Sequence, residues 1–482
     1  MREGSPINTE PHQSDGRAGV WLAVLVASVL LLFHSSVLGG SDGTSMYEVA
    51  KSIVEDGDVA INRGVVWKGR GGNFYSPYGI GLSLLAIIPY VVVRPLARMT
   101  SEPESALQAG VAALMPVIVA LLSAALYRLS RRLGGSSSNS LIVALGTVFG
   151  TYLLIYSNDF FGEPLATLFI VLSIERAVAE SPRLSGAAAA AAALTRPQCF
   201  AFAPLLLWRL YADQGWSAAR RASVPIAASL AVSLAYNFIR WGNVANFGYS
   251  TPELPQGFTN SFLTGAAGLL LHPKKSILLF APISLLLPLA LKFLWKTHRT
   301  GFWLLTGNLV ITFVISAKWW DWGGGWVWGP RLLIPGIIPA LAALGGWSSR
   351  ETHRMRRLVA TLFALGFIVN APAVIVGVGA QLANGLIPPM GPSVVRQAEL
   401  VPVALAYTSG HIYDRFPTST EPPSHVAIWQ FRVTRAMGRR GAPIALLGSL
   451  ILAFGAMFAA FQLRRVLRPT ERRFAGPALW SI

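Results

Sequence analysis

Cysteine, histidine and acidic residues are scarce in this chain of 482 residues. The single cysteine, Cys199, excludes an internal disulfide. The 7 histidines are scattered without an HExxH motif or a Cys/His cluster, so the sequence predicts no zinc site. A Walker loop is also absent, and with it the usual signature of nucleotide hydrolysis.

Charged residues of any kind make up only 13% of the chain, whereas hydrophobic residues make up 53% and the mean hydropathy is +0.50. This balance is typical of a polytopic membrane protein rather than a soluble domain. A span needs roughly 20 apolar residues, so the chain has room for about a dozen spans and for no large separate soluble domain. We attribute the net charge of +18 to basic loops on one side of the membrane rather than to nucleic-acid binding.

Twelve apolar runs predict an all-α polytopic protein with about 11–13 transmembrane helices. They lie at Gly19–Leu38, Pro77–Val93, Ala106–Leu126, Leu141–Ile155, Pro164–Ile174, Gly186–Leu210, Val224–Ile239, Ile277–Leu294, Phe302–Ala317, Leu332–Trp347, Leu358–Gly379 and Pro443–Gln462. The first run is too long for a signal-peptide core and lacks a clear cleavage site, so we expect residues 1–18 to form a cytoplasmic tail before a retained span.

Basic residues gather in five segments that we assign to the cytoplasm: 128–132, 209–221, 292–299, 350–357 and 464–473. If all five are cytoplasmic, Pro77–Val93 does not cross, and we expect an interfacial helix in the first extracytoplasmic loop, 39–105. By the same parity Gly186–Leu210 enters the membrane and returns, with Arg196 near its tip. One kinked helix is the alternative.

These assignments divide the chain into five parts. Residues 1–18 form the tail, 19–380 the transmembrane catalytic region, 381–441 an extracytoplasmic loop, 442–463 the last span and 464–482 a cytoplasmic tail.

Three acidic residues on the predicted outer side are candidates for chemistry. Asp42 lies just beyond the first span, and Asp159 and Glu163 lie in the second outer loop. Carboxylates at a membrane boundary are costly unless they are paired or functional. The alternative for each is a solvated loop acid.

Several cations also lie on the predicted outer side, where the positive-inside rule disfavours them, and they suggest an anionic ligand. The run KWWDWGGGWVWGPR ends in Arg331, which suits bidentate binding of a phosphate, and contains Trp326 as a candidate substrate contact. Lys274 and Lys275 at the mouth of a span are candidate phosphate ligands, as is Arg196; Arg240 lies on the same side. An aromatic belt with a snorkelling arginine is the alternative for Arg331.

The order of these motifs resembles the GT-C superfamily of membrane glycosyltransferases, closest to the protein O-mannosyltransferase and lipid A aminoarabinose transferase branch. The resemblance covers about residues 20–347. It rests on Asp42 followed by Tyr47–Val54, Tyr75–Tyr90, Tyr127–Gly134, Leu194-Thr195-Arg196-Pro197, Asn246–Tyr249, His272–Lys275 and Gly324–Arg331. Many relatives carry Asp-Glu in the first loop, but here Gly43 follows Asp42, and the large C-terminal soluble domain of some relatives is absent.

The resemblance implies an inverting transfer of a sugar from a polyprenyl-phosphate donor to a glycan, lipid or protein acceptor. It places the protein in the bacterial plasma membrane, with its active site on the extracytoplasmic face and membrane lipids around it. Asp42 would be the general base, and the outer cations would hold the donor phosphate. Tyr47, Asp159, Glu163 and Trp326 would contact substrate. The scheme requires no cofactor, although Asp159 is a possible ligand of a divalent cation.

A transporter or lipid flippase for a lipid-linked saccharide is the alternative from another class, because carriers share a polytopic body and broken helices. The absence of repeated halves and the gathering of unusual residues on one side favour the enzyme. A structural subunit without activity is a third hypothesis, which the outer acids and cations disfavour.

Overall fold

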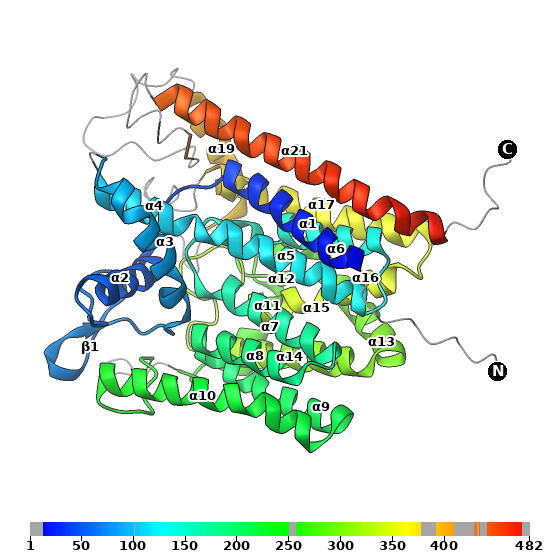
Figure 1. Cartoon of the computed structure of the whole chain (residues 1–482), viewed down its shortest axis with the longest axis horizontal. Helices are drawn as coiled ribbons and strands as arrows, with labels where there is room; N and C mark the ends of the chain where they lie inside the picture. The colour runs from blue at the N-terminus through cyan, green and yellow to red at the C-terminus, as the bar shows by residue number, and fades with distance from the viewer. Residues whose placement is uncertain are drawn as a thin grey trace.

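The computed structural model describes residues 13–100, 102–249, 257–376, 392–408, 429, 430, 433 and 441–474. Within these residues the fold is almost entirely helical, and its long helices run along a common direction (Figure 1). The predicted all-α polytopic fold is confirmed. The one sheet in the described residues is a hairpin of β1 (Trp67–Lys68) and β2 (Phe74–Tyr75), paired antiparallel with Trp67 opposite Tyr75.

Seven helical segments in the described part of the chain are long and apolar enough to cross a membrane. They comprise α1 (Gln13–Leu32), α4 with α5 (Pro103–Ala112 and Leu114–Arg132), α10 (Trp216–Trp241), α14 (Arg299–Lys318), η5 with α15 and α16 (Arg331–Leu333, Ile334–Ala340 and Ala343–Ser348), α17 (His353–Ile375) and α21 (Gly441–Phe474).

The other predicted spans are shorter or interrupted helices. They are α6 (Ser137–Phe149), α7 (Gly162–Val178), α8 (Pro182–Thr195) and α9 (Ala203–Gln214), followed by α12 (Ile277–Phe280), η4 (Pro282–Leu286) and α13 (Leu287–Thr297). A further short apolar helix, α11 (Phe262–Leu271), lies outside the predicted runs. Two further 3₁₀ segments are η2 (Tyr152–Ser157) and η3 (Pro197–Phe202). Proline interrupts the run at Ile277–Leu294, because Pro282 lacks the N–H that would continue the α-helical hydrogen bonds.

The terminal helices lie side by side. α21 packs along α1, as Figure 1 shows, although they are more than 400 residues apart. α1 ends at Leu32 rather than at the predicted Leu38. α21 covers the predicted last span, and α19 (Val394–Thr408) lies within the predicted loop 381–441, most of which falls outside the described residues.

The first predicted outer loop folds into a compact unit at one end of the long helices (Figure 1). It contains α2 (Ser41–Glu55), the β1–β2 hairpin with η1 (Arg70–Gly72), and α3 (Gly81–Ala97). α3 packs against α2 and α4, and Pro89 and Pro95 lie within it. With 17 residues α3 falls short of a full span, which agrees with the predicted interfacial helix.

The segment around Arg196 enters the bundle and returns, as predicted, and the single kinked helix is wrong. Gly186 near the start of α8 packs against Ala222 near the start of α10. Between them the chain passes through Arg196 and comes back along α9. The break occurs because Pro197 ends the helical hydrogen bonding and disfavours helical geometry at the residue before it.

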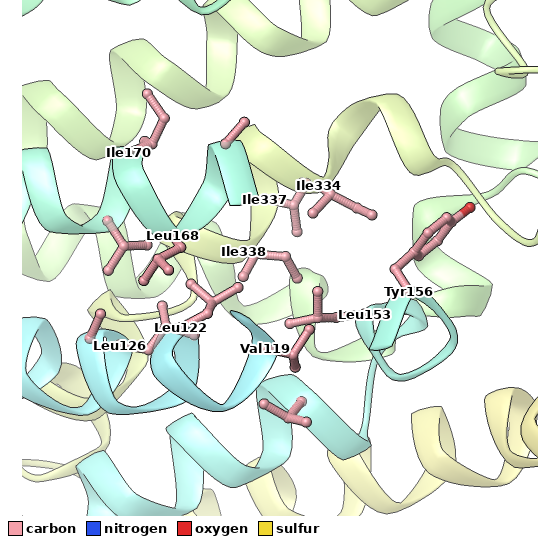
Figure 2. Close-up of a cluster of buried hydrophobic side chains, with 14 of the residues drawn as sticks. Val119, Leu122, Leu126, Leu153, Tyr156, Leu168, Ile170, Ile334, Ile337 and Ile338 are labelled. Atoms are coloured by element: carbon pink, nitrogen blue, oxygen red, sulfur yellow. The ribbon is translucent and has the colours of Figure 1, made fainter. Parts of the chain in front are cut away.

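A cluster of buried side chains from α5, η2, α7 and α15 holds the middle of the bundle (Figure 2). Val119, Leu122 and Leu126 of α5 follow helical spacing, so they form one apolar face. From η2, the Tyr156 hydroxyl donates to the carbonyl oxygen of Trp328 over 2.7 Å. The core therefore fixes the start of α7, where Glu163 lies, and the start of α15, which directly follows Arg331 in η5.

Candidate active site

A cavity of about 1680 Å³ opens beside the first outer unit. Five of the predicted site residues line it: Asp42, Asp159, Arg196, Trp326 and Arg331. They come from four separate stretches of the chain, because Trp326 and Arg331 lie in the same run. The fold thus brings to one wall side chains that are up to 289 positions apart.

Asp42 and Arg331 form an ion pair on this wall. Arg331 Nη1 donates to Asp42 Oδ2 over 2.8 Å, and the two side chains are only 11% and 13% exposed. Burial raises the pKa of the Asp42 carboxyl, but the Arg331 guanidinium and a hydrogen bond from the Tyr78 hydroxyl outweigh it and hold this pKa below its usual value. Asp42 is therefore an ionised carboxylate at neutral pH.

Glycines allow both partners to reach this position. Gly39 and Gly40 have φ of +68° and +99° where the chain turns into α2, which places Asp42 in its first turn. On the other side, a Cβ on Gly324 would lie 3.1 Å from Cγ of Arg331. The guanidinium also lies over the ring of Phe161 at 4.7 Å.

Glu163 and Arg196 extend the pair into a chain of four charges. Arg196 Nη2 donates to Glu163 Oε1 over 2.6 Å, and Arg331 Nε lies 3.8 Å from the same oxygen. With Asp42 the four charges sum to zero, so each of the two arginines has a carboxylate partner. Glu163 is fully buried and does not line the cavity, so it is placed to hold the two arginines rather than to contact a ligand.

Asp159 is the second carboxyl on the cavity wall. Burial raises its pKa to about 7, although Arg331 opposes the shift. A Cβ on Gly39 would lie 2.3 Å from Asp159 Oδ1, and the Phe160 N–H donates to the Leu38 carbonyl oxygen over 2.9 Å. Two carboxyls that line the cavity thus have pKa values moved in opposite directions.

Lys275 is placed differently from the prediction. It is buried, and its Nζ donates to the carbonyl oxygens of Gly325 and Val327 over 2.9 and 2.7 Å. Burial, assisted by Arg331, lowers its pKa to about 7. Lys275 thus holds the glycine-rich loop (residues 319–330). Neither Lys275 nor the partly exposed Lys274 lines the cavity, so the predicted lysine clamp for phosphate is not formed.

Tyr47 also lies away from the cavity. It follows Asp42 by five residues, which turns it about 140° round the helix. Its ring is fully buried against Tyr90, at 5.9 Å between centroids. The structure therefore places Tyr47 in the packing between α2 and α3, and its contact with substrate stays a prediction.

Two residues outside the predicted site complete it. Tyr78 lines the cavity and hydrogen-bonds Asp42. Arg240, 2% exposed, donates from Nη1 to the carbonyl oxygens of Ser76 and Tyr78 over 2.5 and 3.2 Å, and stacks on Tyr236 at 3.8 Å. The sequence signal was an arginine on the disfavoured side of the membrane, but Ser76 and Tyr78, whose carbonyl oxygens it contacts, lie more than 160 positions away.

No three His, Cys, Asp or Glu side chains gather as a metal site among the residues that the structure describes. The possible divalent cation at Asp159 stays a prediction.

Comparisons with known proteins identify the fold. No protein-family model matches the chain, and none of the curated proteins does. Among solved structures, the apo structure of ArnT from Cupriavidus metallidurans aligns with a TM-score of 0.51 and 14% identity, covering 93% of this chain and 78% of ArnT. The chain therefore shares the fold of ArnT.

A second structure of the same ArnT, bound to undecaprenyl phosphate, aligns with a TM-score of 0.50 and 14% identity over 94% of this chain and 77% of ArnT. ArnT is a lipid A aminoarabinose transferase, so the resemblance predicted from the motifs is confirmed for the fold. The seven long apolar helical segments of the described residues also agree with the predicted multi-pass membrane protein.

Proposed function

We propose that this GT-C protein is an inverting glycosyltransferase that moves a sugar from a polyprenyl-phosphate donor to an acceptor hydroxyl on the extracytoplasmic face of the bacterial plasma membrane. The observation that carries the proposal is the buried Asp42–Arg331 ion pair on the wall of the large cavity. The likeness to ArnT bound to undecaprenyl phosphate supports the donor class.

Asp42 is the proposed general base. As the acceptor oxygen attacks the anomeric carbon, its proton moves to the Asp42 carboxylate, and the bond from that carbon to the phosphate oxygen breaks with its electron pair. A single displacement of this kind inverts the anomeric centre. The depressed pKa keeps Asp42 free of protons at neutral pH, although it also makes the carboxylate a weaker base.

Arg331 is the proposed ligand of the donor phosphate, whose negative charge grows as the bond breaks. A phosphate shares the guanidinium with Asp42, weakens its hold on that carboxylate and so raises the basicity of Asp42. Donor binding and base activation are thereby coupled through one side chain. Glu163 and Arg196 keep Arg331 in place during this exchange.

The remaining wall suits a lipid-linked sugar. Phe202, Ile226 and Leu230 line the cavity and offer apolar contacts to an isoprenoid chain. Trp326 lines the same cavity and offers its aromatic ring to the sugar. We assign acceptor orientation to Asp159, which carries a proton below about pH 7.

Phosphate is a good leaving group and Arg331 supplies positive charge, so the scheme requires no resident metal. Transfer that survives EDTA supports this part of the proposal, and restoration of lost transfer by Mg²⁺ or Mn²⁺ contradicts it.

The test is transfer from a panel of labelled polyprenyl-phosphate sugars in membranes, with the anomeric configuration of the product determined. We expect transfer with inversion from at least one donor. Arg331→Gln should weaken donor binding more than acceptor binding, whereas Arg63→Gln, an exposed arginine outside the cavity, should change neither. Leaflet exchange of the lipid-linked sugar without transfer would favour a flippase instead.

A further inference from the structure

A second, smaller cavity of about 360 Å³ lies at the opposite end of the bundle. It is formed where α5 ends, where α13 turns into α14 and where α16 ends. α14 runs from this cavity, at Arg299, to Lys318 near the candidate active site, and its 20 residues span about 30 Å. Figure 1 shows α13 and α16 at the end away from α2.

Three arginines converge on this cavity: Arg132, Arg299 and Arg350. They come from three different basic segments of the sequence. None of the residues that line the cavity, all of them within the described ranges, is acidic. Arg132 pairs with Glu175 at 3.0 Å, whereas Arg299 and Arg350 form no ion pair with any described residue.

The positive-inside rule accounts for basic residues at this end, but it does not require them to face one cavity. Arg354 and Arg357 belong to the same basic segment as Arg350 and are exposed, as Arg299 and Arg350 are, but they lie on the first turns of α17 and do not line the cavity. Elsewhere at this end Arg131 is neutralised by Asp15 at 3.0 Å. The excess charge around the cavity is therefore a local feature.

Aromatic and apolar groups surround the arginines. Leu133 and Phe293 line the cavity, and Arg350 lies over the Phe293 ring at 5.4 Å. Arg299 stacks on Trp295 at 3.7 Å, and the indole is 39% exposed. Tryptophan and arginine together are typical of the level where lipid head groups meet acyl chains.

We propose that this cavity binds the phosphate of an anionic phospholipid from the leaflet facing the predicted cytoplasmic side. Its volume suits a head group, and a basic pocket between transmembrane helices is the setting in which anionic lipids are held. Arg299 and Arg350 supply the charged donors, and Phe293 contacts the adjoining glycerol and acyl carbons. The proposal does not depend on the transferase activity.

The experiment uses the full chain in mixed micelles and measures bound lipid by native mass spectrometry and stability by thermal shift. Phosphatidylglycerol is compared with phosphatidylcholine and with inorganic phosphate. The variant is Arg299→Gln with Arg350→Gln, and its matched control is Arg354→Gln with Arg357→Gln. Wild type should retain phosphatidylglycerol preferentially. The variant should bind it about tenfold more weakly or worse, and the control should match wild type.

Equal losses in both double variants would show diffuse attraction and overturn the site. Inorganic phosphate that stabilises the protein as much as phosphatidylglycerol does would overturn the lipid assignment in favour of a soluble phosphate compound. If the double variant does not fold, Arg350→Gln alone and the charge-conserving Arg299→Lys with Arg350→Lys replace it. Both should weaken phosphatidylglycerol binding, because lysine lacks the bidentate fork, and unchanged binding in both refutes the proposal.

Discussion

Replacement of Asp42 by asparagine separates base catalysis from donor binding, because it keeps the shape of the side chain and removes its charge. General-base catalysis contributes about 10²–10⁴-fold, so we expect Asp42→Asn to lower the rate of transfer by that factor, equivalent to about 3–5 kcal/mol. Donor binding should persist or tighten, since Arg331 no longer shares its charge with a carboxylate.

The same change disturbs the balance of charge in the site. Both side chains of the pair are nearly buried, and removing one partner of a buried pair costs about 3–5 kcal/mol of stability. Here Glu163 stays 3.8 Å from Arg331, so the loss should fall at or below the lower end of that range.

The assay compares wild type, Asp42→Asn and Asp56→Asn at equal amounts of folded protein, measuring transfer and donor binding separately. Asp56 is an exposed aspartate at the end of the same helix, and its replacement should change neither quantity. If Asp42→Asn keeps more than about a tenth of the wild-type rate, Asp42 is not the base. If donor binding is lost together with the rate, the change acts on the fold of the site rather than on proton transfer.

Three further variants test the electrostatics of the site. Arg331→Gln removes the cation that offsets the effect of burial on Asp42, so the pKa of Asp42 should rise and the acid limb of the pH–rate profile should move to higher pH. An acid limb at the wild-type pH would contradict the pairing. The pKa of Asp159 is raised to about 7, so between about pH 4 and 7 the native state binds more protons than the unfolded state, and stability should fall as the pH rises through this range. Thermal unfolding of Asp159→Asn should not show this fall. If the stability of wild type and of Asp159→Asn changes equally with pH, the assignment is refuted. Arg240→Met should lower kcat through Tyr78, so adding Tyr78→Phe should cost little more, whereas additive losses would show that Arg240 acts elsewhere.

The sequence predicted the class of fold and part of the site for physical reasons that are local. Apolar runs near 20 residues and one-sided basic residues are properties of short segments, and they indicated the polytopic α fold and the returning segment around Arg196. Asp42 and Arg331 stood out because charges at a membrane boundary are costly. The sequence did not predict that Tyr47 lies away from the cavity, because its angle round the helix from Asp42 was not considered. Nor did it predict the buried position of Lys275, whose carbonyl partners begin 50 positions later.

By itself, then, the sequence determined that the chain is a helical membrane protein with scarce acids and unusually placed cations on one side. Only the tertiary structure decided which of these charges meet. It paired Asp42 with Arg331 and Arg196 with Glu163, turned Arg240 onto the carbonyls beside Tyr78, and collected Arg132, Arg299 and Arg350 round a second cavity. A buried charge must find a partner wherever the packing of helices brings one, and that partner is set by three-dimensional contact rather than by distance along the chain.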